Sequence, residues 1–251
     1  MESLASKILF VVEGKREKQI FQKVLELVGE KESYIYIYDT NIHVLYQKIK
    51  ATENEVDSFA NFLAINKIKD NEGNLLISAG TKANDVFSSI YLIFDLEPQD
   101  SKLNYQEIDW LLRYFDDETR NGLLFINYPL LEAMFDEFRY DYLPNNYLQT
   151  CYLDHVKTSC KKYKKEITSF SIYSNYEHQY SGLDDKTIIT IFLNTYRKIK
   201  YLGYLDSSCF DRLELNKFEF EQLMQDKVYI INTSILLMLR YRLGYDLVKE
   251  E

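Results

Sequence analysis

Lys7-Ile-Leu-Phe-Val-Val12 is the stretch that decides the fold, and Glu13 and Gly14 follow it directly. A short apolar run rich in β-branched and aromatic residues is typical of a strand buried in a parallel sheet. The spacing of apolar residues over 15–28 is that of a helix, and Gly29 supplies a stop signal. The chain is therefore predicted to open with a buried strand followed by an amphipathic helix.

Further strands and helices alternate along the first half of the chain. The segments 34–38, 89–94 and 123–126 have the composition of strands, whereas 41–68 and 104–115 have helical spacing. Strands that alternate with helices predict an α/β fold in which helices flank a parallel sheet.

The character of the sequence changes after about residue 145. Apolar spacing there becomes helical almost throughout, as in Ile188, Ile191 and Phe192. A chain of 251 residues is long enough for one large domain, or for one domain with an extension. We expect an α/β domain over 1–145 and a helical region over 146–251 packed on it, because no linker separates the two.

The composition excludes several classes of protein. Hydrophobic residues make up 46% of the chain, yet no apolar run reaches membrane-spanning length and no signal-peptide pattern occupies 1–10. We expect a soluble cytoplasmic protein that does not enter a membrane. Cys151, Cys160 and Cys209 lack CxxC spacing, so they predict neither a disulfide framework nor a thiolate zinc site.

Charge is distributed unevenly along the chain. The net charge is -9, and residues 1–145 carry 15 Lys and Arg against 25 Asp and Glu, whereas residues 146–251 carry 15 against 14. An acidic N-terminal part binds a polyanion poorly by itself. Nucleic-acid chemistry in that part would need bound cations, the other half of the chain or a partner.

Polar side chains follow the predicted strands at the points where the strands end. These side chains belong to Glu13, Asp39, Asp95, Glu97 and Asn127. Ligands bind at the carboxyl ends of strands in open parallel sheets, so we expect the five to share one edge. Glu17, one turn into the first helix, faces the same side. Such oxygen-rich acidic clusters suit Mg²⁺ or Mn²⁺ better than zinc.

Simpler roles exist for some of these carboxylates. Glu17 taken alone is typical of a solvated helix residue, and Asp39 taken alone is typical of a helix N-cap. Glu13 and Asp95 follow two different strands, and Gly14 lets the backbone bend sharply between strand and helix. This joint placement favours a metal site.

Two of these segments resemble the motifs of the TOPRIM family. Ile8-Leu-Phe-Val-Val-Glu13-Gly14-Lys15-Arg16-Glu17 is similar to its first motif, and Ile93-Phe-Asp95-Leu-Glu97 is similar to its second, hhDxD. The resemblance covers roughly residues 7–140. It is strongest with small bacterial TOPRIM nucleases of the OLD type and related phage-defence proteins.

The resemblance implies a metal-dependent nuclease, more an endonuclease than an exonuclease, that cuts DNA or RNA, tRNA included. Glu13 and Glu17 are then the catalytic residues, and Glu13, Glu17, Asp95 and Glu97 hold Mg²⁺ or Mn²⁺. Glu97 replaces an Asp of the motif, and its extra methylene moves the carboxylate by about 1.5 Å. That difference bears on whether one metal or two bind.

The same resemblance implies a biological setting. It is that of an effector of bacterial anti-phage defence, acting by abortive infection beside an ATPase. The ATPase would be a separate chain, because no GxxxxGK[ST] loop is present here. A homodimer is one assembly compatible with this setting.

Asn127 and Glu132 form a further candidate pair. Pro129 suits the first position of a helix, which leaves Asn127 to cap that helix or to reach the acidic edge. Glu132 would lie one turn into the helix, either on the surface or at the same edge.

Two basic groups are candidates for nucleic-acid contact. They are Lys15 and Arg16 near the carboxylates, and Lys157, Lys161, Lys164 and Lys165 in the second half, with Tyr152 and Tyr163 interleaved as stacking rings. A solvated helix surface is the alternative for both groups.

Two other functions compete with the nuclease. One is a catalytically silent TOPRIM-like module that binds a partner ATPase or a phage protein, suggested by the acidic surface and by Glu97. The other is a primase-like nucleotidyl transferase, which is disfavoured because this sequence has no separate nucleotide-binding motif.

The three histidines do not indicate a metal site. His43, His155 and His178 are scattered and have no metal-site spacing.

Overall fold

A five-stranded sheet forms the centre of the computed structural model, with strand order β2-β1-β3-β5-β4. The structure describes residues 7–30, 33–52, 81–136, 152–154, 162–165, 183–206, 209–240 and 242–249, with the single positions 59, 62, 63, 69, 75 and 77. The strands are β1 (Ile8–Val12), β2 (Ser33–Ile37), β3 (Ser89–Asp95), β4 (Asp116–Asp117) and β5 (Gly122–Asn127).

The four long strands run parallel, as the alternation of strands and helices predicts. Strand β1 pairs with β2 on one side and with β3 on the other, and β3 pairs with β5. Their β-branched and aromatic side chains are buried on both sides of β1, β3 and β5. Strand β4 is antiparallel to β5, and its two polar residues carry no alternation from which a strand could be predicted.

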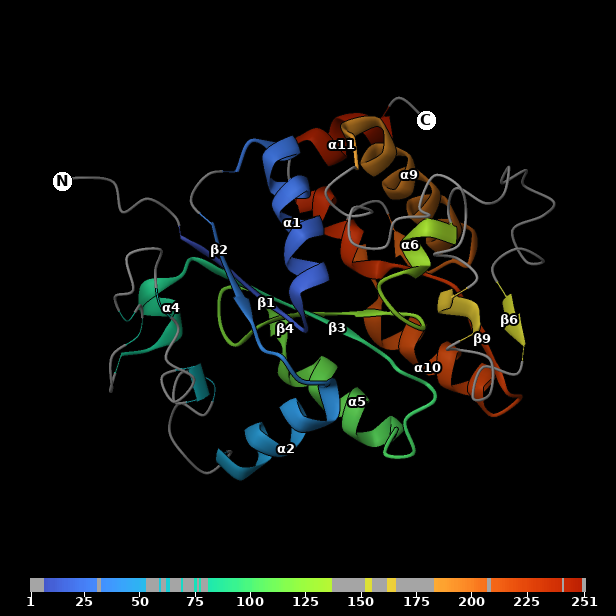
Figure 1. Ribbon diagram of the computed structural model, residues 1–251, viewed down its shortest axis with the longest axis horizontal. Helices are drawn as coiled ribbons and strands as arrows, with labels where there is room; N and C mark the ends of the chain where they lie inside the picture. The colour runs from blue at the N-terminus through green and yellow to red at the C-terminus, as the bar shows by residue number, and fades with distance from the viewer. Residues whose placement is uncertain are drawn as a thin grey trace.

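Helices cover both faces of the sheet. Helix α1 (Lys15–Val28) lies above the strands in Figure 1, whereas α2 (Ile42–Thr52) and α5 (Tyr105–Tyr114) lie below them. The short α4 (Ala83–Val86) precedes β3. Helix α1 has the predicted bounds and ends at Gly29, whose φ of 74° is left-handed.

The second half of the chain contains helices, as predicted, but also short strands. Its elements are α6 (Ala133–Asp136), β6 (Tyr152–Asp154), α9 (Asp185–Tyr201), β7 (Leu205–Asp206), β8 (Cys209–Phe210), α10 (Arg212–Leu223), β9 (Lys227–Tyr229), the 3-10 helix η3 (Thr233–Arg240) and α11 (Arg242–Lys249). Strands β6 and β9 pair antiparallel, as do β7 and β8. The predicted helices of the C-terminal part are therefore confirmed, and the short strands were not predicted because two or three residues leave no periodic signal.

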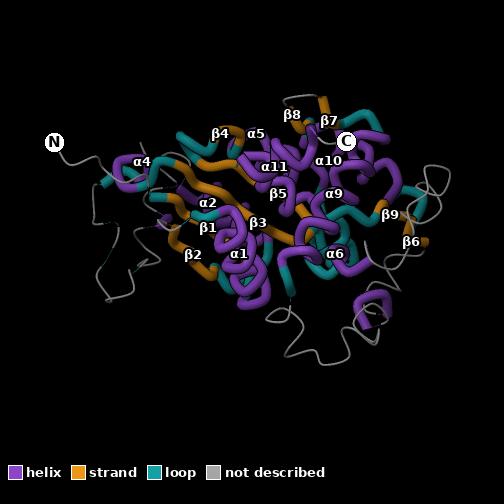
Figure 2. The backbone as a smooth tube through the Cα atoms, turned by 90° about the horizontal axis from the view of Figure 1, so that it is seen from above, coloured by secondary structure: helices purple, strands orange, loops and turns teal. Residues whose placement is uncertain are grey.

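The two halves of the chain share one core. Tyr128 and Ile231 exchange two backbone hydrogen bonds of 2.8 Å, and Thr233 Oγ1 donates to the carbonyl of Ile126 at 2.6 Å. Figure 2 shows α9, α10 and α11 beside the end of the sheet that carries β5. Buried apolar residues of both halves belong to one continuous cluster. The predicted boundary at 145/146 lies outside the described residues.

None of the described helices combines the length and the apolar character needed to cross a lipid bilayer.

Candidate functional site: an acidic rim at the sheet edge

Strands β1 and β3 bring Glu13 and Asp95 together at the carboxyl edge of the sheet. Val12 pairs with Ile93, so the residues that follow lie side by side. The backbone N–H of Asp95 donates to Glu13 Oε2 at 3.1 Å. The convergence expected from the strand ends is therefore present. We call Glu13, Glu17, Asp95, Glu97 and Glu132 the acidic rim.

Glu17 is a buried member of the rim. Only 7% of its surface is exposed, although it occupies the first turn of α1. Its carboxylate folds back over the strand-to-helix turn, since a Cβ atom on Gly14 would lie 3.1 Å from Glu17 Oε2. The alternative interpretation of Glu17 as a solvated helix residue is therefore wrong.

Burial and mutual repulsion raise the pKa of three rim carboxyls. Burial raises the pKa of Glu13 to about 8, and the charges of Glu97 and Glu17 add to the rise. Burial also raises the pKa of Asp95 well above its usual value, helped by Glu13, Glu17 and Glu132. The pKa of Glu17 is raised by burial and by Glu132. A cation placed among these groups would reverse this effect.

Asn127 holds the side chain of Asp95 and does not cap the helix that follows Pro129. Asn127 is fully buried, its Nδ2 donates to Asp95 Oδ1 at 3.2 Å, and its Oδ1 accepts from the backbone N–H of Ser234 at 3.2 Å. Helix α6 begins only at Ala133, so Pro129 is not at its first position. The capping role expected for Asn127 is therefore wrong, and its second candidate place, at the acidic edge, is the one it occupies.

Among the ion pairs of the described residues, Glu132 is the rim carboxylate that pairs with basic side chains. It is 1% exposed and precedes α6, so neither a surface role nor a place one turn into a helix is correct. Its Oε1 lies 2.8 Å from Arg16 Nη1 and 2.8 Å from Lys164 Nζ. Burial favours a high pKa, but Lys164 and Arg16 outweigh it, and the pKa of Glu132 lies below its usual value.

The predicted nucleic-acid contacts are placed in part. Lys15 is exposed at the start of α1, and Lys165 is exposed in a helical turn at 162–165. In the same turn Tyr163 is only 5% exposed, so its expected role in stacking on bases is wrong. The predictions for Lys157, Lys161 and the side chain of Tyr152 lie outside the described residues.

Asp39 and Glu97 flank the buried part of the rim in left-handed backbone conformations. Asp39 is exposed with a φ of 58°, and its N–H donates to the backbone carbonyl of Glu13 at 2.9 Å. Asn41 rather than Asp39 caps α2, because Asn41 Oδ1 accepts from the N–H of Val44 at 3.2 Å. Glu97 has a φ of 50°, and burial together with Asp100 raises its pKa.

His43 is a neighbour of the rim that sequence spacing does not reveal. It lies in the first turn of α2, is 4% exposed, and places Nδ1 3.5 Å from Glu107 Oε2. The charge of His43 opposes the rise in the pKa of Glu97. Its place in the first turn of the helix that follows β2 is a signal that the sequence offers.

The rim offers the ligand chemistry of a hard cation without a ready-formed cage. Its donors are carboxylate oxygens, which suit Mg²⁺ and Mn²⁺. Within the described part of the chain, however, no three His, Cys, Asp or Glu side chains are already arranged to hold one ion. Closing around an ion would therefore require the rim side chains to rotate.

Comparisons of the chain with protein-family models, with curated proteins and with solved structures each gave no match. The class that the fold defines is an α/β protein with a mostly parallel five-stranded sheet and an acidic carboxyl edge.

Proposed function

We propose that this protein is a Mg²⁺-dependent or Mn²⁺-dependent TOPRIM-like nuclease that cleaves phosphodiester bonds of DNA or RNA. The observation that carries the proposal is the seating of the Glu13 carboxylate on the backbone N–H of Asp95, beside the buried Glu17. Buried carboxylates at the carboxyl edge of a parallel sheet, with raised pKa values, are typical of functional sites.

Each rim residue has a part in this chemistry. A bound divalent cation would polarise the phosphoryl oxygens and neutralise charge at the leaving group. Asp95, held by Asn127, and the buried Glu17 are the ligands we assign to it, together with Glu97. Glu13, whose pKa of about 8 a bound cation would lower, is the group we assign to proton transfer, as general acid or general base.

Exposed cations lie next to the carboxylates and can contact the substrate backbone. Lys15 follows Glu13 and Gly14 directly, and its side chain is exposed. Arg16 and Lys164 pair with Glu132 while their side chains stay 39% and 35% exposed. They can therefore hold Glu132 and still face a phosphate. Since the chain carries net charge -9, we assign the approach of a polyanion to this local group.

The proposed setting is bacterial anti-phage defence, with a separate ATPase as partner. It rests on the resemblance of the Glu13 and Asp95 segments to TOPRIM motifs.

The test is cleavage of plasmid, single-stranded DNA and tRNA by purified protein with Mg²⁺ or Mn²⁺. Glu13→Gln and Asp95→Asn should each lower the rate by about 10²-fold or more, because each removes a group used in the transition state. Asp116→Asn, which alters an exposed carboxylate on β4, is the matched control and should keep the wild-type rate. Undiminished cutting by Glu13→Gln and Asp95→Asn would contradict the proposal.

A catalytically silent, partner-binding module is the second candidate. It is favoured by the pairing of Glu132 with Arg16 and Lys164, and by the lack of a preassembled ion cage among the described residues. Ion binding separates the two candidates. Mn²⁺ should raise the melting temperature of the wild type and leave that of Asp95→Asn unchanged if the nuclease proposal holds. Equal curves with and without Mn²⁺ would favour the silent module.

A further inference from the structure

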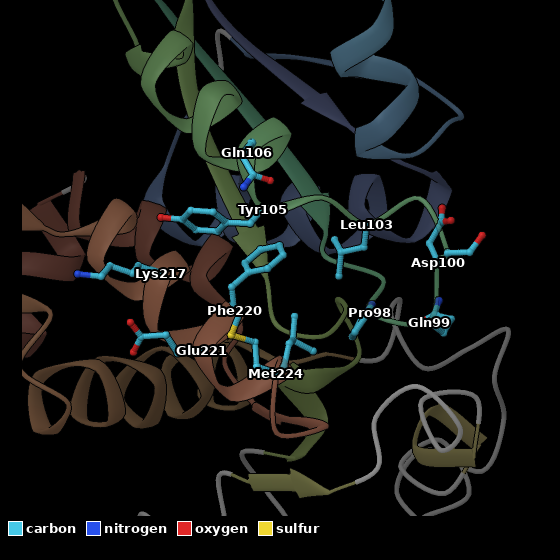
Figure 3. A pocket seen from close by; sticks show the side chains of 12 residues that line it. Pro98, Gln99, Asp100, Leu103, Tyr105, Gln106, Lys217, Phe220, Glu221 and Met224 are labelled. Carbon is cyan, nitrogen blue, oxygen red and sulfur yellow. The ribbon is translucent and has the colours of Figure 1, made fainter.

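A pocket of about 760 Å³ lies between α10 and the loop that connects β3 to α5. Figure 3 shows Phe220 between Tyr105 and Met224, with Leu103 and Pro98 facing it. A volume in this range is typical of sites for small organic groups.

The floor of the pocket is aromatic and rests on two helices. Tyr105 begins α5 and Phe220 belongs to α10, and their ring centroids lie 5.1 Å apart at 66°. Met224, at the end of α10, is 89% exposed, the highest value among the described large apolar side chains. Rings and a polarisable thioether on helices give a flat ligand a preformed surface on which to stack.

The polar groups of the pocket suit an uncharged planar ligand with hydrogen-bonding edges. Gln99 and Gln106 carry amides, which both donate and accept, and Glu221 accepts only. Lys217 is the single basic residue of the described lining, against the two carboxylates of Asp100 and Glu221. This charge balance disfavours a phosphate inside the pocket. It is compatible with a nucleobase, whose ring N–H and amino groups need acceptors.

The loop that forms one wall of the pocket also carries a residue of the acidic rim. This loop follows β3 and contains Glu97, whose own N–H donates to the carbonyl of Pro129 at 3.1 Å. The N–H of Asp100 donates back to the carbonyl of Glu97 at 2.8 Å, and the N–H of Leu103 donates to the carbonyl of Asp100 at 3.1 Å. One short, internally bonded loop therefore connects a rim carboxylate to the pocket wall.

We propose that this pocket binds an unpaired nucleobase of the nucleic-acid substrate, stacked on Phe220, while the adjoining backbone crosses the acidic rim. The inference rests on the proposed nuclease function and specifies its substrate, a strand with at least one unpaired base. Bases stacked on aromatic side chains are a general mode of single-strand recognition, and they place the backbone outside the stacking pocket.

The test measures binding without a divalent cation, so that it does not depend on the metal site. The probe is a single-stranded oligonucleotide that contains 2-aminopurine, whose fluorescence is quenched by stacking, in the presence of EDTA. Phe220→Leu keeps an apolar side chain but removes the ring, and it should weaken binding by about 5-fold to 100-fold and abolish the quenching. Met224→Ser should weaken binding less and cannot disturb the core, because Met224 is 89% exposed.

The matched control is Tyr201→Leu, which removes a half-exposed ring of α9 that does not line the pocket. It should leave both affinity and quenching unchanged. The proposal is overturned if Phe220→Leu binds the strand as tightly as the wild type does. It is also overturned if Phe220→Leu changes the oligomeric state and leaves the binding unchanged. A mononucleotide that binds as tightly as the strand would also overturn it, since the site would then serve a free nucleotide.

Cleavage measured beside binding separates the two proposals. If Phe220→Leu cleaves single-stranded and duplex DNA at the wild-type rates, the pocket assignment is overturned and the nuclease proposal still holds. The opposite result is a wild-type protein that cleaves nothing with Mg²⁺ or Mn²⁺ but whose quenching is abolished by Phe220→Leu. That result supports the pocket assignment and overturns the nuclease proposal.

Discussion

Glu219 of α10 is a fully enclosed carboxyl that lies outside the acidic rim. Its Oε2 accepts from the backbone N–H of Tyr229 at 3.0 Å, and its Oε1 has no hydrogen-bond partner among the described residues. Burial raises the pKa of Glu219 well above the usual value of 4.5, against the opposing effect of the Tyr229 N–H. The native protein therefore holds this side chain as a neutral acid at pH values where the unfolded chain releases the proton.

Glu219 should make the free energy of unfolding fall as the pH rises. Above about pH 4.5 the unfolded state loses the Glu219 proton and the native state keeps it, so each further pH unit favours unfolding until the native pKa is reached. Glu219→Gln keeps the shape and removes the titration. Its stability relative to the wild type should grow by about 1.4 kcal/mol per pH unit within that window. Urea unfolding at a series of pH values from about 5 upward measures this difference.

Glu221→Gln is the control for this residue. Glu221 lies two positions further along α10 and is exposed, so its replacement should shift stability by the same small amount at every pH. Parallel curves of stability against pH for Glu219→Gln and the wild type would show that Glu219 is ionised in the native state.

At the scale of elements, Gly122 decides how β5 enters the sheet. Its φ of 117° is closed to residues with a side chain, and a Cβ atom there would lie 2.5 Å from Leu92 Cδ1 and 3.2 Å from Ile90 Cγ2. Both neighbours belong to β3, which pairs with β5. The missing side chain therefore lets the two central strands approach at the start of their pairing.

Gly122→Ala should lower the free energy of unfolding by about 2 to 4 kcal/mol, since backbone strain and overpacking against β3 add. Gly29→Ala is the matched control. Gly29 has a φ of 74° but nothing within 4 Å of its Cβ position, so only the strain of about 1 to 2 kcal/mol remains. Chemical denaturation of both variants measures the difference. Equal losses would show that β3 yields to the added methyl group.

At the scale of the whole molecule, the two halves of the chain stabilise each other. Arg212 Nη1 of α10 donates to the carbonyls of Phe115 and Leu124 at 3.0 and 2.8 Å. Helix η3 packs on β5 and supplies the N–H that holds Asn127. The orientation of Asp95 therefore depends on residues of the second half.

The chain should unfold in a single cooperative transition. Calorimetry should give equal calorimetric and van't Hoff enthalpies, because separating the halves exposes the core that both line. Fragments 1–145 and 146–251, expressed separately, should each lack a cooperative thermal transition. A mixture of the two fragments is the control, because it tests whether the halves can complement each other. Two separate transitions, or a fragment 1–145 that melts cooperatively, would contradict this expectation.

The sequence by itself determined the four parallel strands of the sheet, helix α1 and the meeting of Glu13 with Asp95. Buried parallel strands and amphipathic helices have their own periodicities, and the ends of parallel strands share one edge. These features depend on residues close in sequence and on one general rule of topology. The same local signals explain why β1, β3 and β5 are within a residue or so of their expected bounds.

Only the tertiary structure decided which polar groups are neutralised and which are not. Arg16 pairs with Glu132 across 116 positions, and Ser234 holds Asn127 across 107. Asn41 took the cap expected of Asp39, and Tyr163 turned out to be buried. No periodicity encodes such pairs, because their energies come from burial and from partners that meet only when the chain is folded.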